Sequence, residues 1–146
     1  MPHSSWTLHP QIAKDTVPVG DLPLTRVLLA VDANYPWLIL VPRLPGLVEL
    51  IDLEENAQVQ LLGEIAVAAR VLKETTACEK LNIAALGNQV AQLHVHVIAR
   101  RRGDAAWPKP VWGFTPAVAY EPAVQAAFIG SLRQRLQPAS LTDVDR

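Results

Sequence analysis

Cysteine is nearly absent from this chain, and its scarcity limits the kinds of site that the protein can build. Cys78 is the single cysteine among 146 residues. One cysteine cannot form an intramolecular disulfide, and it cannot supply the cysteine cluster of a structural zinc site. We therefore expect a protein of a reducing compartment, the cytoplasm, that folds without disulfide bonds.

Charged residues are also scarce, and neither sign dominates. They make up 18% of the sequence and leave a formal net charge of −1. This balance provides no general basic surface, so neither nucleic acid nor a membrane is an expected partner. Half of the residues are hydrophobic, which argues against a disordered chain.

Long apolar runs are missing as well. Prolines break the apolar stretches, and the first ten residues, MPHSSWTLHP, lack the apolar core of a secretory signal. We expect no membrane-spanning segment, and a single domain for a chain of 146 residues. His3 and His9 lie in an N-terminal stretch that we expect to be mobile, and we assign them no role.

Strand-like segments occur in two pairs. TRVLLAVD (25–32) and WLILVPR (37–43) are separated by the turn-like ANYP, which predicts a hairpin. KLNIAALGN (80–88) and AQLHVHVIAR (91–100) are joined by a short polar turn. Short links of this kind favour antiparallel pairing.

Two helices are predicted. The first covers about 53–76, with Asp52 as N-cap and Glu55 in capping-box position. The second starts at Pro122 and ends before Pro138, and 139–146 is expected to be a loose tail. Between the last strand and the second helix lies the stretch RRGDAAWPKPVWGFTP (101–116). It has too many prolines for a regular element, so we expect an ordered loop. The fold class is therefore α+β, with helices covering one face of a mainly antiparallel sheet of about five strands.

The stretch QLHVHVI (92–98) contains the most informative residues. Side chains alternate along a strand, so Gln92, His94 and His96 are predicted on one face and Leu93 and Val95 on the core face. Three interpretations compete for the two histidines: a structural pair, a metal site, and covalent catalysis by an imidazole.

The residues that follow bear on this choice. A metal site needs a third ligand, for which only distant residues such as Asp32 or Glu49 are available. The neighbouring Arg100, Arg101 and Arg102 disfavour a cation, and they suit phosphate oxygens instead.

These residues resemble the signature of the histidine triad family of nucleotide hydrolases and transferases. That signature is His-φ-His-φ-His-φ-φ, with φ apolar, after a short Gly-polar-polar-Val turn. GNQVAQLHVHVIARR (87–101) matches it, except that Gln92 stands in place of the first histidine. LLAVDANYPWLILVP (28–42) is similar to the strand–turn–strand of the family, and Trp107-Pro108 to a pair that follows the triad in one branch. The resemblance implies a HIT-like core at about 20–112, with a C-terminal helical extension at about 121–137.

The resemblance also implies an activity and a set of site residues. His94 would attack the α-phosphorus of a nucleotide and form a nucleotidyl-histidine intermediate, which water then hydrolyses, with His96 and Gln92 completing the catalytic set. Substrates would be dinucleoside polyphosphates or nucleoside phosphoramidates, no cofactor or metal would be required, and the chain would form a homodimer. The implied nucleotide-binding residues are Asp32, Asn82, Asn88, Gln89 and Trp107.

Gln92 is the main departure from the family. The first histidine of the triad mainly orients its neighbours, and a glutamine can donate and accept hydrogen bonds but cannot carry a proton. We expect activity to survive. A Gln92→His variant with unchanged activity would indicate that this position only orients its neighbours. A gain of more than about tenfold in rate would indicate that it matters for catalysis. Trp37 is a second departure, which would narrow the base pocket. The alternative is a non-catalytic protein that binds or senses nucleotides with an altered triad.

Overall fold

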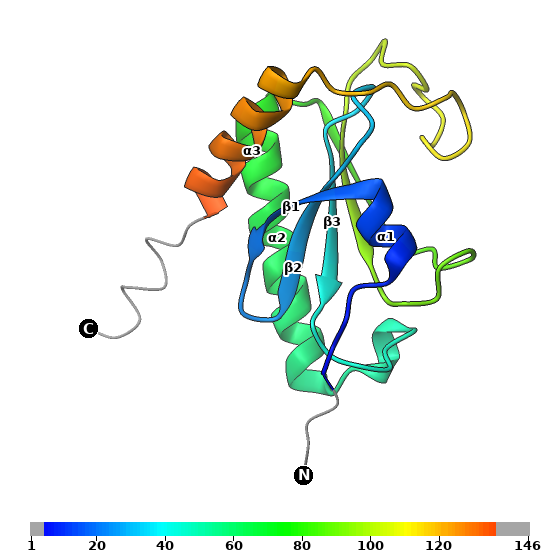
Figure 1. Ribbon diagram of the computed structural model, residues 1–146, viewed down its shortest axis with the longest axis vertical. Helices are drawn as coiled ribbons and strands as arrows, with labels where there is room; N and C mark the ends of the chain where they lie inside the picture. The colour runs from blue at the N-terminus through cyan, green and yellow to red at the C-terminus, as the bar shows by residue number, and fades with distance from the viewer. Residues whose placement is uncertain (1–4, 137–146) are drawn as a thin grey trace.

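The structure, a computed structural model, describes residues 5–136 and consists of one sheet with helices on both faces (Figure 1). In chain order the elements are α1 (Pro10–Asp15), β1 (Thr16–Asp21), β2 (Thr25–Ala30), β3 (Trp37–Pro42), the 3₁₀ helix η1 (Leu50–Asp52), α2 (Glu55–Thr76), β4 (Lys80–Ala84), β5 (Val95–Arg100) and α3 (Pro122–Leu136). Within the described residues, no helix is long and apolar enough to cross a membrane.

The strands form one antiparallel sheet in the order β1-β2-β3-β5-β4. This confirms the predicted α+β fold with a five-stranded antiparallel sheet and a C-terminal helix. The predicted hairpin is β2–β3, in which Leu28 lies opposite Ile39. Strand β1 is not predicted, because Pro18 and Gly20 interrupt its pattern; the pairing with β2 shifts register between these two residues.

The N-terminal stretch is ordered from residue 5, so the expectation of mobility is wrong for residues 5–15. Pro10 occupies the first turn of α1, where its missing N–H costs nothing. The Nδ1 atom of His9 caps the helix by accepting the backbone N–H of Gln11 at 3.0 Å. Ile12 is buried against the sheet, and Figure 1 shows α1 on the face opposite α2.

The segment between β4 and β5 is a loop, so the predicted strands 80–88 and 91–100 are shorter in the structure. Gly87 has a φ of +71°, in the left-handed region that favours glycine, and turns the chain. Leu93 then donates its backbone N–H to the carbonyl of Leu47 at 3.0 Å. As a result, His94 lies just before β5, and His96 is the second residue of the strand.

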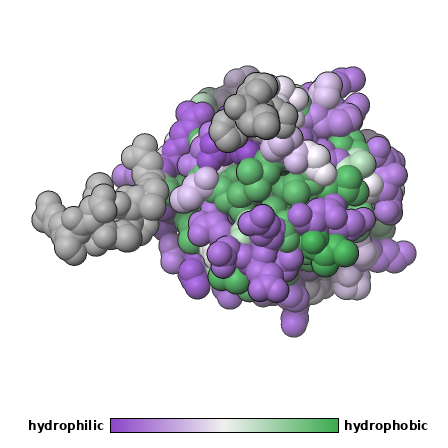
Figure 2. Space-filling view, turned by 90° about the horizontal axis from the view of Figure 1, so that it is seen from below, coloured by the Kyte–Doolittle hydropathy of each residue, from purple (hydrophilic) through white to green (hydrophobic). Residues whose placement is uncertain are grey.

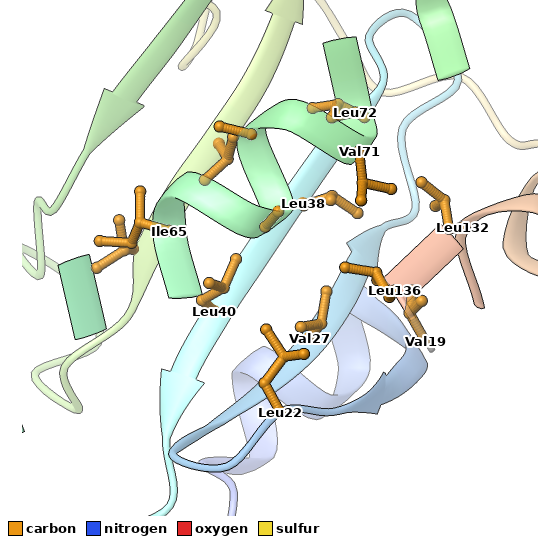
Figure 3. Packing of buried hydrophobic residues seen from close by; sticks show 14 of the residues in the cluster. Val19, Leu22, Val27, Leu38, Leu40, Ile65, Val71, Leu72, Leu132 and Leu136 are labelled. Carbon is orange, nitrogen blue, oxygen red and sulfur yellow. The ribbon is translucent and has the colours of Figure 1, made fainter. Parts of the chain in front are cut away.

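The main core lies between the sheet and the helices α2 and α3 (Figure 3). Leu38 and Leu40 of β3 face Leu72 and Ile65 of α2 there. Leu93 and Val95 of the histidine strand also belong to this core, as predicted, and so do Val97 and Ala99. The opposite face of the sheet is therefore free to carry the polar residues of β5.

The start of α2 differs from the prediction. The helix begins at Glu55 with Glu54 as N-cap, and not with Asp52. The carboxylate of Asp52 instead accepts the backbone N–H groups of Val48 and Glu49, at 3.1 and 2.7 Å. Asp52 therefore stabilises the turn at η1, and the predicted capping box with Glu55 is wrong.

Helix α3 begins at Pro122, as predicted, and is described up to Leu136. Pro138 and the tail at 139–146 lie outside the described residues. Arg133 ties the helix to β1, because its guanidinium donates to the carbonyls of Val19 and Pro18 at 2.7 and 3.2 Å. Leu132 and Leu136 complete the contact by packing into the main core.

Candidate active site

Two neighbouring imidazoles mark the candidate site. The ring centroids of His94 and His96 are 5.0 Å apart. Strand alternation directs both rings away from the main core and toward a cavity of about 570 Å³. This volume is typical of sites for small organic ligands.

The cavity has a floor and three walls. Trp37 and Ile39 of β3 and Ala30 of β2 form its floor on the sheet. The walls are α1, the loop at 86–90 and the loop at 111–117. Each wall comes from a different part of the chain, so the site depends on how these three segments are held.

The protonation of His94 follows from its partner. Nδ1 of His94 lies 2.6 Å from the backbone carbonyl oxygen of Gln92. A carbonyl can only accept, so Nδ1 carries the proton and donates it. In the neutral form of the ring, the lone pair is then on Nε2, where an imidazole needs it to act as a nucleophile.

The protonation of His96 is fixed in the opposite sense. The indole N–H of Trp37 donates to Nδ1 of His96 at 3.0 Å. An indole N–H can only donate, so Nδ1 is unprotonated and Nε2 carries the hydrogen. Burial, assisted by the adjacent His94, lowers the pKa of His96 to about 4. At neutral pH, His96 is therefore a neutral imidazole with one N–H to offer to a ligand.

This pKa predicts a measurable titration. In an NMR titration, the Cε1 proton of His96 should shift with a midpoint near 4, below the ordinary value of 6.5. The unfolded chain then binds more protons than the folded chain between these values, so the free energy of unfolding should fall as pH drops from 6.5 to 4. Trp37→Phe removes the hydrogen bond to the neutral form and should raise the midpoint. A midpoint near 6.5 in the unchanged protein would contradict this assignment.

Three of the five predicted nucleotide-binding residues line the cavity: Asp32, Asn88 and Gln89. Oδ1 of Asp32 accepts the backbone N–H groups of Asn34 and Val118, at 3.0 and 3.2 Å. These bonds connect the β2–β3 turn to the segment before α3. They leave Oδ2 of Asp32 available to a ligand.

Asn82 and Trp107 do not line the cavity. Oδ1 of Asn82 accepts a hydrogen bond from Arg100 at 2.8 Å, and the ring of Trp107 lies 5.6 Å from the same guanidinium. A different tryptophan reaches the site: the ring of Trp112 contacts His96 edge-on, with centroids 5.1 Å apart. Gly113, which follows Trp112, has a φ of +68°, so the chain turns directly after this tryptophan.

The three arginines after β5, which suit phosphate oxygens by their chemistry, have protein partners in the structure. Arg100 is 1% exposed and donates two hydrogen bonds to Asp104, at 2.7 and 3.0 Å. Arg101 donates to the carbonyl of Thr76, and Arg102 pairs with Glu79 at 3.7 Å. None of the three lines the cavity.

Gln92 also points elsewhere. Its side chain is hydrogen-bonded to the backbone of Thr7 and His9, and it is not among the residues that line the cavity. It borders a second, smaller hollow of about 130 Å³, which His94 also lines. Only two of the three polar residues predicted to form one row therefore face the candidate site.

Metal ligands are not gathered at the site. Among residues 5–136, no group of three or more histidine, cysteine, aspartate or glutamate side chains is placed to hold a metal ion. Asp32 and Glu49, the distant ligands considered above, do not form such a group with the two histidines.

Comparison with known proteins agrees with this geometry. The family model of the HIT domain matches residues 11–103. The chain belongs to the histidine triad (HIT) family. This HIT fold supports a nucleotide-binding, hydrolase or transferase role. Among curated proteins, no sequence matches the chain.

Solved structures of HIT proteins superpose closely on this chain. A histidine triad protein from Bradyrhizobium japonicum is 57% identical, covers 90% of this chain and 98% of its own, and has a TM-score of 0.89. One from Sinorhizobium meliloti is 42% identical, with coverages of 92% and 99% and a TM-score of 0.89. One from Marinobacter aquaeolei is also 42% identical, with coverages of 92% and 98% and a TM-score of 0.89.

Proposed function

We propose that this HIT protein is a nucleotide hydrolase or nucleotidyl transferase that acts at the α-phosphate of a nucleoside phosphate derivative. The observation that carries the proposal is the tautomer of His94, whose Nδ1 is bonded to the carbonyl of Gln92 while Nε2 keeps its lone pair. Nε2 forms a bond to phosphorus as the P–O or P–N bond to the leaving group breaks, and the leaving group takes up a proton from solvent. Water then attacks phosphorus, the P–N bond to His94 breaks, and a nucleoside monophosphate is released.

Charge on the phosphate oxygens is stabilised by neutral donors in this proposal. The Nε2–H of His96 and the side chains of Asn88 and Gln89 lie in the cavity wall and floor and carry N–H groups for this purpose. His96 acts as a hydrogen-bond donor and not as an acid, since its pKa of about 4 keeps it neutral. The chemistry proposed here needs no metal-activated water, and we propose that no cofactor is required.

The nucleoside is placed over the floor of the cavity. Asp32 suits the ribose hydroxyls, because its carboxylate accepts two hydrogen bonds from a diol. The apolar surface of Ala30, Val31 and Ile39 suits the base. Trp37 closes one side of this floor, and its indole N–H is already bonded to His96.

The charged residues that line the cavity favour one substrate class over the other. Asp15 and Asp32 both line it, whereas none of its described lining residues is lysine or arginine. A polyphosphate chain carries several negative charges and finds no cation here to neutralise them. We propose a substrate of low charge, a nucleoside phosphoramidate, over a dinucleoside polyphosphate.

The test compares the two substrate classes directly. We expect kcat/KM for an adenosine phosphoramidate to exceed that for a diadenosine polyphosphate by more than about tenfold, in buffer that contains EDTA. Equal rates would contradict the charge argument. Turnover that disappears in EDTA would contradict the metal-free chemistry.

A non-catalytic nucleotide binder is the second candidate. The observation that favours it is Gln92, whose amide is bonded to the N-terminal backbone, so the triad keeps only two imidazoles at the site. Tight binding of nucleotides without turnover in the same assay would favour this function.

We also propose that the chain forms a homodimer across β4. The two edges of the sheet differ: Arg133 covers the carbonyls of Pro18 and Val19 on β1, whereas in the described chain β4 pairs only with β5. Apolar side chains also gather at the end of the molecule where α2 begins (Figure 2), and Leu62 in α2 is 68% exposed. Sedimentation of the chain and of an Ile83→Lys variant in β4 tests this assembly.

A further inference from the structure

The N-terminal segment, defined here as Trp6–Asp15, crosses the face of the sheet that carries the site. Trp6, Leu8 and Ile12 pack on this face against Leu28 and Ile39 of the hairpin. Figure 1 shows the segment running over the sheet before it turns into β1. Its position is set by side chains that contact the sheet directly.

This segment is also a wall of the cavity. Gln11, Ile12 and Asp15 of α1 all line the cavity that His94 and His96 line from the opposite side. A ligand bound over the sheet therefore contacts residues that belong to the first helix. If α1 moves, the cavity loses one of its three walls.

The side chain of Gln92 holds this segment with both ends of its amide. Oε1 accepts the backbone N–H of His9 at 2.8 Å, and Nε2 donates to the backbone carbonyl of Thr7 at 2.8 Å. These two backbone groups flank Leu8 and point to the same side. The amide thus takes the place that the backbone of a neighbouring strand would take.

We propose that Gln92 is a positioning residue that holds the N-terminal segment in place as a wall of the ligand cavity. The amide suits this role because its donor and acceptor are attached to one carbon and point in the same general direction. The two nitrogens of an imidazole point away from each other and cannot engage the backbone groups of Thr7 and His9 together. The inference rests on the proposed function for the identity of the ligand, but not for the contact itself.

Gln92 serves the two sides of the cavity through different groups. Its side chain holds the wall, and its backbone carbonyl accepts from Nδ1 of His94. A change of the side chain leaves the carbonyl in place. Loss of the amide should therefore weaken ligand binding, seen in Kd and KM, more than it slows kcat.

His9 offers a matched pair of variants that isolates one of these bonds. Its φ of −55° is close to the angle that proline requires, so His9→Pro removes the backbone N–H and keeps the φ of residue 9. His9→Ala keeps that N–H. Both variants lose the imidazole that caps α1, so they differ at the group that Gln92 binds.

Two readouts separate the contact from its effect on the ligand. Hydrogen exchange of the peptide that covers 5–15 measures whether the segment is held. Calorimetry with AMP and GMP measures the affinity of the cavity for a nucleotide. In His9→Pro and in Gln92→Met, we expect exchange of this peptide to be about tenfold faster and the Kd for the bound nucleotide to rise about tenfold. His9→Ala also loses the cap of α1 but keeps the N–H that Gln92 binds, so both its exchange rate and its Kd should change several-fold less than those of His9→Pro.

The outcomes are distinguishable. Unchanged exchange in His9→Pro and Gln92→Met would overturn the role of Gln92. Faster exchange with unchanged affinity would overturn the role of the segment as a wall. An unchanged protein that binds neither AMP nor GMP would overturn the proposed nucleotide function, and the exchange data would still decide whether Gln92 holds the segment.

Discussion

Replacing His94 with alanine is expected to lower kcat/KM for a nucleoside phosphoramidate by on the order of 10³-fold or more. The variant lacks Nε2 of His94, which is the only ring nitrogen of the two histidines with a lone pair available for attack. Nδ1 of His96 already accepts from Trp37, and Nε2 of His96 carries a hydrogen. Without a nucleophile, water must attack phosphorus directly. The residual rate then reflects only the binding and hydrogen bonding that the cavity still supplies.

The intermediate provides the second measurement. Rapid denaturation of the unchanged protein during turnover, followed by mass spectrometry of peptides, should locate a nucleotidyl group on His94. His9→Ala is the matched control, because it makes the same substitution at a histidine that does not line the cavity. A nucleotidyl group on any other residue would contradict the mechanism, and so would full turnover by His94→Ala.

Replacing Arg100 with methionine is expected to destabilise the fold by about 3–5 kcal/mol. The guanidinium is 1% exposed and bonds Asp104, Asn82 and the carbonyl of Lys109, at distances between 2.7 and 3.0 Å. It also lies 5.7 Å from the ring of Tyr35. Methionine fills a similar volume but leaves the Asp104 carboxylate without its cation.

Urea denaturation measures this loss, and a neighbouring arginine provides the control. The side chain of Arg102 is 81% exposed and lies 3.7 Å from Glu79, so Arg102→Met should cost less than about 1 kcal/mol. Similar losses in the two variants would contradict the assignment of Arg100 as a buried structural residue.

The pH dependence of stability should reveal the same ion pair. Burial alone would raise the pKa of Asp104, but hydrogen bonds from Arg100 and from the backbone of Arg101, Trp107 and Ala106 lower it to about 2. The carboxylate therefore stabilises the fold above its ordinary pKa of 3.8, and this contribution is lost as pH falls toward 2. In Arg100→Met, the free energy of unfolding should fall less over this range of pH.

Local patterns predict this fold and the centre of the site well. Alternation along QLHVHVI correctly separates Leu93 and Val95 from His94 and His96, because side chains of a strand must point to opposite faces. The hairpin of β2 and β3 follows from two apolar runs with a short turn between them. Both signals act over a few residues, so they can be read without knowledge of the rest of the chain.

Contacts between distant segments explain what the patterns miss. Arg100 looks like a solvated residue at the end of a strand, but the loop after β5 folds back and buries it with Asp104. The same loop brings Trp112 to His96 and leaves Trp107 beside Arg100. Gln92 is bonded to residues more than 80 positions earlier in the chain, a separation that no local pattern encodes.

The alternation of β5 also predicts how substitutions will be tolerated. Odd-numbered positions such as Val95 and Val97 lie in the main core, whereas His94 and His96 line the cavity on the opposite face. Polar replacements at the odd positions should lower the amount of folded protein, whereas replacements of the two histidines should lower activity far more than they lower abundance. Within one strand, residues that limit abundance thus alternate with residues that limit activity, and a comparison of the two traits across variants would trace both faces of the sheet.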